Sequence, residues 1–290
     1  MQQIRVGVSV RPQHTTYARM RAAWLEAEEV GADTVFIWDH FFPLFGDSAG
    51  AHFECWTLLA ALAEVTTRVQ FGALVSSTAY RNPNLLADMA RTVDHISGGR
   101  ATLGIGAGWA QRDYDEYGYA FKPPPERLRD LASALPIITD RLGKLNPGPV
   151  NGTLPILIGG SGEKVTLRLV AQYADMWNGM GDPAEAGRLS HVLDEWCGEI
   201  GRDPSEIERS ILLAGRPQAE QADNYLANGI THLIIGVNGP GSDLDVLREL
   251  VAWRDARISE ALPSWLDPCL ASGARQSEAA VNWGPAASGR

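Results

Sequence analysis

The stretch IRVGVSVRPQHTTYARMRAAWLEAEEVGADTVFIW, residues 4–38, contains the structural unit that decides the fold. Residues 4–10 alternate along the chain as a strand does, and residues 34–38 are rich in β-forming side chains. Between them, residues 17–30 carry apolar side chains at spacings of three and four, which is typical of a helix buried on one face. Gly31 follows, where the end of a helix favours a left-handed residue. This order predicts a strand, a covering helix and a second, parallel strand.

The same unit recurs along the chain. Strands are predicted at residues 69–75, 101–105, 155–158, 175–178, 207–213 and 231–237, and helices at residues 53–65, 126–142, 163–173, 217–228 and 243–259, with two more beginning at Pro83 and Pro183. Asn82 and Asp182 precede these prolines as N-caps. Eight strand–helix units in about 255 residues predict a (β/α)8 barrel. The competing open doubly wound sheet requires a Gly-rich turn after the first strand, where this chain has residues 11–14, RPQH.

Composition excludes several classes of protein. Of 290 residues, 45% are hydrophobic and 21% charged, which is ordinary for a folded globular domain. The formal charge of −10 disfavours nucleic acid as a partner, and no apolar run reaches the roughly 18–20 residues that span a membrane. Residues 1–10 lack the pattern of a secretory signal. Cys55, Cys197 and Cys269 are too scattered for a disulfide framework, and no motif suggests a metal site. We therefore expect a cytoplasmic protein.

Residues 261–290 differ from the rest of the chain. Ala, Ser, Gly and Pro dominate there, and no helical or alternating pattern persists. We expect a barrel over residues 1–260, followed by a disordered or loosely packed tail. Trp265, Cys269 and Trp283 are unusual in a disordered segment, which leaves open that the tail covers a partner surface.

The first candidate site follows the second strand, in residues 38–42, WDHFF. The functional side chains of a barrel lie at the carboxyl ends of its strands, so Trp38 and Phe42 are expected to line a substrate pocket. His40 is the side chain best suited to exchange a proton near neutral pH. The alternative is structural: Asp39 caps a turn and His40 is a core histidine.

The fourth strand ends in residues 104–109, GIGAGW. Small residues allow the backbone to approach a planar ligand, and Trp109 is placed to stack on it or to gate the site. Glycines at a strand end also occur for structural reasons alone. Trp177 follows in the sixth strand, and with Trp38, Trp56 and Trp109 it is expected to form an aromatic pocket.

The fifth strand runs into residues 159–162, GGSG, directly before a predicted helix. Exposed backbone N–H groups at the N-terminus of a helix attract anions, and the helix dipole adds to this. Lys164 would add positive charge, so a phosphate group is the expected ligand. The alternative is a tight turn in which Ser161 is a plain N-cap.

These segments together resemble the bacterial luciferase-like monooxygenase superfamily. The segments that carry the resemblance are residues 33–41, 80–83, 92–100, 103–109, 155–164 and 174–178, which cover about residues 3–257 in the family's order. The closer resemblance is to the deazaflavin-dependent (coenzyme F420) oxidoreductases. It implies an α/β barrel that binds a reduced flavin or deazaflavin at the strand ends, in a protein that is often a homodimer.

The resemblance also implies roles for individual residues. Asp39 would contact the hydroxyl group of the deazaflavin ring, and His40 would lie near the reacting ring carbon as a proton donor or pocket wall. Ala73–Leu74 corresponds to a cis peptide bond that bulges behind the ring. Further cofactor-contact positions are Ser76, Ala107, Gly108 and Arg112. The phosphate-binding turn is matched by Gly159, Gly160, Gly162 and Glu163.

Two departures qualify the resemblance. Trp109 occupies the position where sugar-phosphate dehydrogenases of the family carry a catalytic Glu, so a reaction of that type is not expected. Residues 143–154 form a shorter excursion than in many relatives, which suggests a more open or differently lidded substrate pocket. We expect an F420-dependent oxidoreductase that transfers a hydride to or from a small organic substrate. The alternatives are an FMN-dependent monooxygenase, in which Trp38, Trp56 and Trp109 shield the flavin from water, and a non-catalytic F420- or flavin-binding protein.

Overall fold

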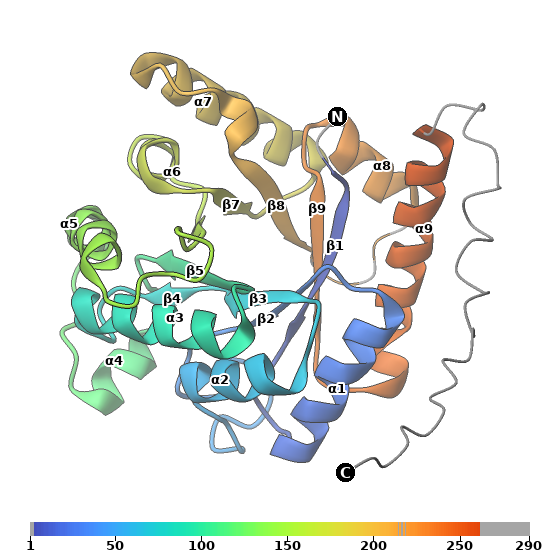
Figure 1. The fold of residues 1–290 in the computed structure, drawn as a ribbon, viewed down its shortest axis with the longest axis horizontal. Helices are drawn as coiled ribbons and strands as arrows, with labels where there is room; N and C mark the ends of the chain where they lie inside the picture. The colour runs from blue at the N-terminus through green and yellow to red at the C-terminus, as the bar shows by residue number, and fades with distance from the viewer. Residues whose placement is uncertain (1–2, 214, 216, 218, 262–290) are drawn as a thin grey trace, which may run out of the picture.

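The computed structural model describes residues 3–261 except residues 214, 216 and 218, and Figure 1 shows its fold. The strands are β1 (Arg5–Val10), β2 (Thr34–Ile37), β3 (Gln70–Ala73), β4 (Ser76–Ser77), β5 (Ala101–Gly106), β6 (Ile156–Gly159), β7 (Met176–Gly179), β8 (Glu208–Leu213) and β9 (His232–Val237). The helices are α1 (Tyr17–Val30), α2 (Cys55–Val65), α3 (Pro83–Ser97), α4 (Gln111–Tyr117), α5 (Pro124–Lys144), α6 (Thr166–Tyr173), α7 (Pro183–Ile200), α8 (Ala219–Ala227) and α9 (Asp245–Ala261).

The strands form one closed, parallel sheet. Their order is β3-β2-β1-β9-β8-β7-β6-β5-β4, and β3 also pairs with β5, which closes the ring. The short β4 continues the path of β3 and pairs with the end of β5. Helices lie around the outside of the strands (Figure 1). The predicted (β/α)8 barrel is therefore confirmed, and the open doubly wound sheet is excluded.

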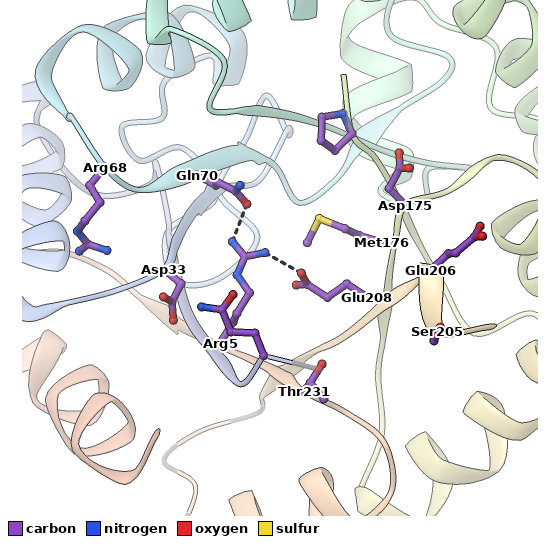
Figure 2. A pocket seen from close by; sticks show the side chains of 12 residues that line it. Arg5, Asp33, Arg68, Gln70, Asp175, Met176, Ser205, Glu206, Glu208 and Thr231 are labelled. Atoms are coloured by element: carbon purple, nitrogen blue, oxygen red, sulfur yellow. Dashed lines mark hydrogen bonds and ion pairs between the residues drawn. The ribbon is translucent and has the colours of Figure 1, made fainter. Parts of the chain in front are cut away.

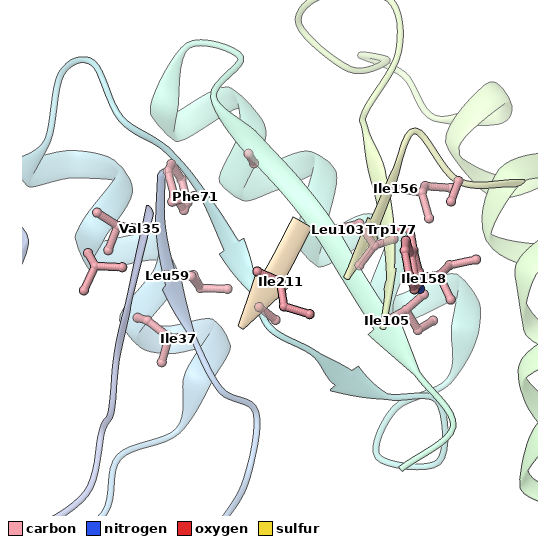
Figure 3. Close-up of a cluster of buried hydrophobic side chains, with 14 of the residues drawn as sticks. Val35, Ile37, Leu59, Phe71, Leu103, Ile105, Ile156, Ile158, Trp177 and Ile211 are labelled. Carbon is pink, nitrogen blue, oxygen red and sulfur yellow. The ribbon is translucent and has the colours of Figure 1, made fainter. Parts of the chain in front are cut away.

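The main apolar core lies between the barrel and its helices. Val6, Val8 and Val10 of β1 are fully buried in it, so the residues between them face the inside of the barrel. Figure 3 shows part of this core, where side chains of β2, β3, β5 and β6 are drawn with Leu59 of α2. A smaller cluster fills the barrel itself and consists of Phe36, Leu74, Leu157, Met176 and Ile234, with Val75 and Leu212 at its edge.

The helix ends follow the signals in the sequence. Gly31 and Gly98 end α1 and α3 in the left-handed conformation, with φ of 105° and 68°. The side chains of Asn82 and Asp182 accept hydrogen bonds from backbone N–H groups in the first turns of α3 and α7. Local capping chemistry therefore sets these boundaries, as the sequence predicts.

Three local details differ from the sequence prediction. The strand at residues 69–75 is interrupted, and its cis peptide bond is Leu74–Val75, one bond later than expected. The backbone N–H of Leu74 still donates to Ile37 at 2.9 Å, so the pairing of β3 with β2 continues to that residue. Helix α6 begins at Thr166, because residues 163–165 form turns, and α4 has no counterpart in the prediction.

The predicted tail, residues 261–290, lies outside the described residues except for Ala261, the last residue of α9. Among the described residues, no helix combines the length and the apolar character needed to cross a membrane.

Candidate active site

Side chains predicted to carry chemistry meet at the carboxyl ends of the strands, here called the mouth of the barrel. Trp38 and His40 follow β2, and Trp109 follows β5. Because the strands are parallel, these ends lie at the same end of the barrel. The rings of Trp38 and Trp109 lie edge-on to that of His40, at centroid distances of 6.0 and 5.5 Å. The structure thus brings together three of the predicted residues from two strands.

His40 is held by a carboxylate that sequence reasoning missed. Its Nδ1 lies 2.6 Å from Oδ2 of Asp113 in α4. Asp113 is 1% exposed, and it also accepts hydrogen bonds from the backbone N–H of Phe41 at 3.0 Å and from the hydroxyl of Tyr80 at 2.8 Å. Three donors from two separate segments therefore converge on one buried carboxylate, and this fixes the orientation of the His40 ring.

The electrostatics of this cluster favour a charged Asp113. Burial opposes ionisation, but the hydrogen bonds from His40, Phe41 and Tyr80 hold the pKa of Asp113 below its ordinary value. Burial and the nearby Asp113 raise the pKa of Tyr80, so its phenol remains a donor. A carboxylate that accepts from Nδ1 leaves Nε2 as the nitrogen that can exchange a proton with a ligand. Among the described residues, Nε2 has no hydrogen-bond partner.

Asp39 belongs to a second buried network. Its carboxylate, 1% exposed, accepts from Ser76 Oγ at 2.6 Å and from both terminal nitrogens of Arg81 at 2.5 and 3.2 Å. Arg81 also donates to Glu54 at 2.6 Å. Burial raises the pKa of Asp39, and the charge of Arg81 counters this effect. Asp39 and Ser76 are therefore close together, as the resemblance implies, but Arg81 already occupies the Asp39 carboxylate.

Three predicted positions lie in the apolar core outside the barrel. Trp56 is 3% exposed and donates from Nε1 to Ser76 at 2.9 Å. Trp177 is fully buried and donates to the carbonyl of Gly160 at 2.8 Å, and Ala73 is also fully buried in this core. The structure thus corrects the prediction that Trp56 and Trp177 line a pocket. Met176, not Trp177, is the residue of β7 that faces the barrel interior.

Glycines make room for the bulge that follows β3. Leu74 lies in the interior cluster with Val75 at its edge. A Cβ at Gly106 or Gly159 would lie 2.8 or 3.0 Å from a Val75 methyl group, so larger residues there would collide with it. Gly108 has φ of 76°, and a Cβ there would lie 1.9 Å from the Tyr114 hydroxyl. The glycines at the ends of β5 and β6, and Gly108 just after β5, therefore serve close packing at the mouth.

The remaining predicted residues after β2 and β5 lie on the rim of the mouth. Trp109 is 64% exposed. The guanidinium of Arg112 lies 4.1 Å above the ring of Phe42 and donates to the carbonyl of Ser48 at 2.6 Å. Ala107 is half-buried against the main core. Arg112 and Phe42 therefore brace the loop after β2 against α4.

The turn after β6 keeps its backbone donors available. Gly160 has φ of 134° and donates from its N–H to Asn178 at 3.0 Å. Ser161, Gly162 and Glu163 are exposed, and their N–H groups donate to no described residue. Helix α6 begins at Thr166 without a side-chain cap. Free N–H groups in the turn that leads into an uncapped helix fit an anionic group, as the sequence suggests.

A separate depression of about 520 Å³ lies at the opposite end of the barrel, here called the base (Figure 2). Arg5 at the start of β1 donates to Glu208 at 2.7 Å and to Gln70 at 2.6 Å. Nδ1 of the buried His232 lies 2.5 Å from Glu208. Despite burial, His232 and Arg5 lower the pKa of Glu208 to about 2. These charges join the first residues of four strands, so we interpret the base as a structural network.

Sequence reasoning missed Asp113, Tyr80 and Arg81. Asp113 lies 73 positions from His40 in sequence, in a helix of seven residues whose clearest signal is Gly118, its left-handed C-cap. Tyr80 and Arg81 belong to a segment that carries the family resemblance, but neither the spacing nor the residue types indicate which carboxylate each would contact.

Comparison with known proteins agrees with this architecture. A curated relative, the phthiodiolone/phenolphthiodiolone dimycocerosates ketoreductase of Mycobacterium tuberculosis (strain ATCC 25618 / H37Rv), is 26% identical over 258 residues, which cover 76% of this chain and 67% of the relative. An F420-dependent secondary alcohol dehydrogenase, solved with an F420–acetone adduct, superimposes with a TM-score of 0.77 at 17% identity, covering 87% of this chain and 99% of that one.

A solved FMN complex has a more distant likeness. It is the oxygenating constituent of 3,6-diketocamphane monooxygenase from Pseudomonas putida, with a TM-score of 0.59 at 18% identity, covering 76% of this chain and 70% of that one. At these identities the structural matches establish the shared fold alone. The family model described as luciferase-like monooxygenase matches residues 2–238. The closed barrel and this match over most of the sequence place the chain in the luciferase-like monooxygenase family of oxidoreductases.

Proposed function

We propose that this protein is a deazaflavin-dependent oxidoreductase that transfers a hydride between coenzyme F420 and a small organic substrate. The observation that carries the proposal is the His40–Asp113 pair at the mouth, with Nδ1 of His40 2.6 Å from the buried carboxylate. Such a pair presents one oriented imidazole nitrogen for proton exchange. The family assignment and the F420-dependent structural neighbour support the choice of reaction class.

The residues at the mouth fit such a cofactor. The unpaired N–H groups at Ser161, Gly162 and Glu163 suit a phosphate group in the side chain of the cofactor. The bulge at Leu74–Val75 and the interior cluster beneath it offer an apolar surface for a ring. When bound, the deazaflavin supplies a ring carbon that gives or accepts the hydride.

The protein's own part is to orient the substrate and to move one proton. Asp113 orients His40 through Nδ1, so that Nε2 can protonate the atom next to the one that receives the hydride. Trp38 and Trp109 flank His40 and restrict water around it. Trp109 carries no acidic group, so the proton is assigned to His40.

An FMN-dependent monooxygenase is the second candidate. The observation that favours it is the state of Asp39, the residue through which the resemblance selects a deazaflavin: its carboxylate is buried and paired with Arg81. With that residue engaged, cofactor choice depends on other contacts around the ring. The structural neighbour with FMN has the same fold, so this candidate requires a direct test.

The test is equilibrium binding of oxidised F420 and of FMN, each followed by tryptophan fluorescence. The proposal expects F420 to bind at least tenfold more tightly than FMN, a difference of about 1.4 kcal/mol. The reverse preference would support the monooxygenase. Absence of binding of either cofactor would mean that the family relationship preserves the fold alone, and binding without turnover on a panel of carbonyl compounds and activated alkenes would favour a binding protein.

A further inference from the structure

Arg11 places a second positive charge at the mouth, apart from the glycine turn after β6. It follows β1 directly, and its backbone N–H donates to Val237 at 2.9 Å, which extends the pairing of β1 with β9. Since Val6, Val8 and Val10 face the outer core, alternation places Arg11 on the inner side of the barrel. It therefore lies at the mouth itself.

The surroundings of Arg11 hold its guanidinium but do not neutralise it. The guanidinium carbon lies 5.9 Å from the centre of the Trp38 ring and 5.5 Å from that of Phe45. A Cβ at Gly236 would lie 2.7 Å from its Nη2, so this glycine makes room for the charge. Its one hydrogen bond to a described side chain is a long contact of 3.5 Å to the amide oxygen of Asn238.

No described carboxylate lies within ion-pair distance of Arg11. Burial lowers the pKa of Arg11, and Asp243, which attracts the guanidinium from farther away, partly counters this effect. Arg81 and Arg254 pair with Asp39 and Asp33. The half-buried Arg100 and Arg127 also lack a carboxylate, but both donate to backbone carbonyls at 2.7–2.9 Å, which Arg11 does not do among the described residues. A half-buried cation that stacks on two rings but has no carboxylate is suited to bind an anion.

The position of Arg11 favours an anionic group of the substrate over one of the cofactor. The rings of Trp38 and His40 are 6.0 Å apart, and Arg11 lies over the same Trp38 ring. A small molecule lying on Trp38 would therefore reach both Arg11 and His40. In the ring of strands, β1 is separated from β6 by β9, β8 and β7, so Arg11 is remote from the turn that fits the cofactor phosphate.

We propose that Arg11 binds a carboxylate group of the substrate. The substrate class is then an unsaturated or carbonyl compound with an apolar or aromatic body and a carboxylate a few bonds from the reacting carbon. This inference rests on the proposed function, because it takes His40 as the position of the reacting carbon. Arg11 acts as a specificity residue: it selects carboxylates over their neutral analogues.

The test uses two probes of the same shape, cinnamate and cinnamamide. Their binding is measured by titration calorimetry, with and without saturating oxidised F420, in wild type, Arg11→Met and Arg11→Lys. Arg21→Met is the matched control, because Arg21 is exposed on α1 and its substitution removes the same positive charge. Thermal unfolding of each variant confirms that it folds, and Arg11→Lys keeps the charge in case Arg11→Met is unstable.

The proposal expects wild type to prefer cinnamate, and Arg11→Met to weaken cinnamate at least tenfold, or about 1.4 kcal/mol, with cinnamamide unchanged. Arg11→Lys should fall between the two, and Arg21→Met should match wild type. Equal affinity for both probes, no effect of Arg11→Met, or no binding up to about 10 mM would overturn the inference. A matching loss of F420 affinity in Arg11→Met would overturn it too, by assigning Arg11 to the cofactor.

The binding arm without F420 does not depend on the proposed function. Selective cinnamate binding that requires Arg11, in a protein that binds no F420, would support the anion site and refute the proposed function. F420 binding together with equal affinity for cinnamate and cinnamamide would support the proposed function and refute the anion site.

Discussion

The two ends of the barrel use similar charged residues in different ways. At the base, Glu208 of β8 pairs with Arg5 of β1 and with His232 of β9. At the mouth, Asp113 fixes one nitrogen of His40 and leaves the other without a described partner, and no described carboxylate lies within ion-pair distance of Arg11. The base pairs its charges internally, whereas the mouth holds the two groups that we propose bind a ligand.

This difference indicates where stability and function lie in the fold. Paired charges at the starts of strands hold the ring together, and changing one should cost free energy of unfolding. Groups that are held in place but have unused hydrogen-bonding capacity should behave differently. Changing one of them should lower binding or turnover with little effect on stability.

The largest effect is expected for His40→Ala. Loss of the proton-transfer group should lower kcat about 10²- to 10⁴-fold, with the Kd for F420 within about threefold of wild type. Steady-state kinetics and fluorescence titration measure the two quantities. His191→Ala, a histidine with a side chain 77% exposed, is the control and should change neither. Equal losses in kcat and in cofactor affinity would remove His40 from the chemistry.

At the base, Glu208→Gln should act on stability instead. It leaves Arg5 and His232 without their shared carboxylate, and we expect the free energy of unfolding to fall by about 3 kcal/mol with kcat unchanged. Denaturant titration measures the loss. Glu206→Gln, at the neighbouring exposed pair with Arg202, should cost at most about 1 kcal/mol. A large loss of kcat in Glu208→Gln would contradict the division between the two ends.

The same carboxylate predicts a dependence of stability on pH. The pKa of Glu208 is about 2 in the folded protein, against 4.5 for the free group, so its contribution is present above pH 4.5. As the pH falls from about 4.5 towards 2, protonation is disfavoured in the folded state and this stability is lost. The pH dependence of the unfolding midpoint should therefore be shallower for Glu208→Gln than for wild type over this window, and identical slopes would refute the assignment.

Asp113→Asn should affect turnover less than loss of His40 itself. The amide leaves the imidazole in place but no longer favours the Nδ1–H form, so we expect kcat to fall about 10- to 100-fold. The Kd for F420 should stay within about threefold of wild type, because Asp113 acts through the orientation of His40. Rescue of kcat by Asp113→Glu would support a positioning role. A fall in kcat that matches a loss of F420 affinity or of folding stability would indicate a purely structural role.

Signals that act over a few residues made the fold predictable. Caps such as Asn82 and Gly31 set helix ends through contacts within one turn, and the alternation of residues 4–10 matches β1. His40 could be selected because its position directly after a strand places it at the mouth in any barrel of this kind.

The features that could not be predicted from the sequence depend on contacts between distant segments. Asp113 is held by hydrogen bonds from Phe41 and Tyr80, and these residues come close to it only in the folded barrel. In β7, Met176 and Trp177 are both apolar, and the register with neighbouring strands decides which faces the interior.

The smallest effect on stability is expected at a buried hydroxyl of the base that has no described hydrogen-bond partner. The hydroxyl of Thr231 is buried without a described partner, so Thr231→Val should leave stability unchanged or raise it by up to about 1 kcal/mol. Thr66→Val is the same change where the hydroxyl donates to Leu62 at 2.7 Å and accepts from Arg100 at 2.9 Å, and should cost about 1–3 kcal/mol. If both variants lose similar amounts of stability, the Thr231 hydroxyl has a hydrogen-bond partner in solution, such as a bound water. The hydroxyl groups of the base would then be paired, as its charged groups are.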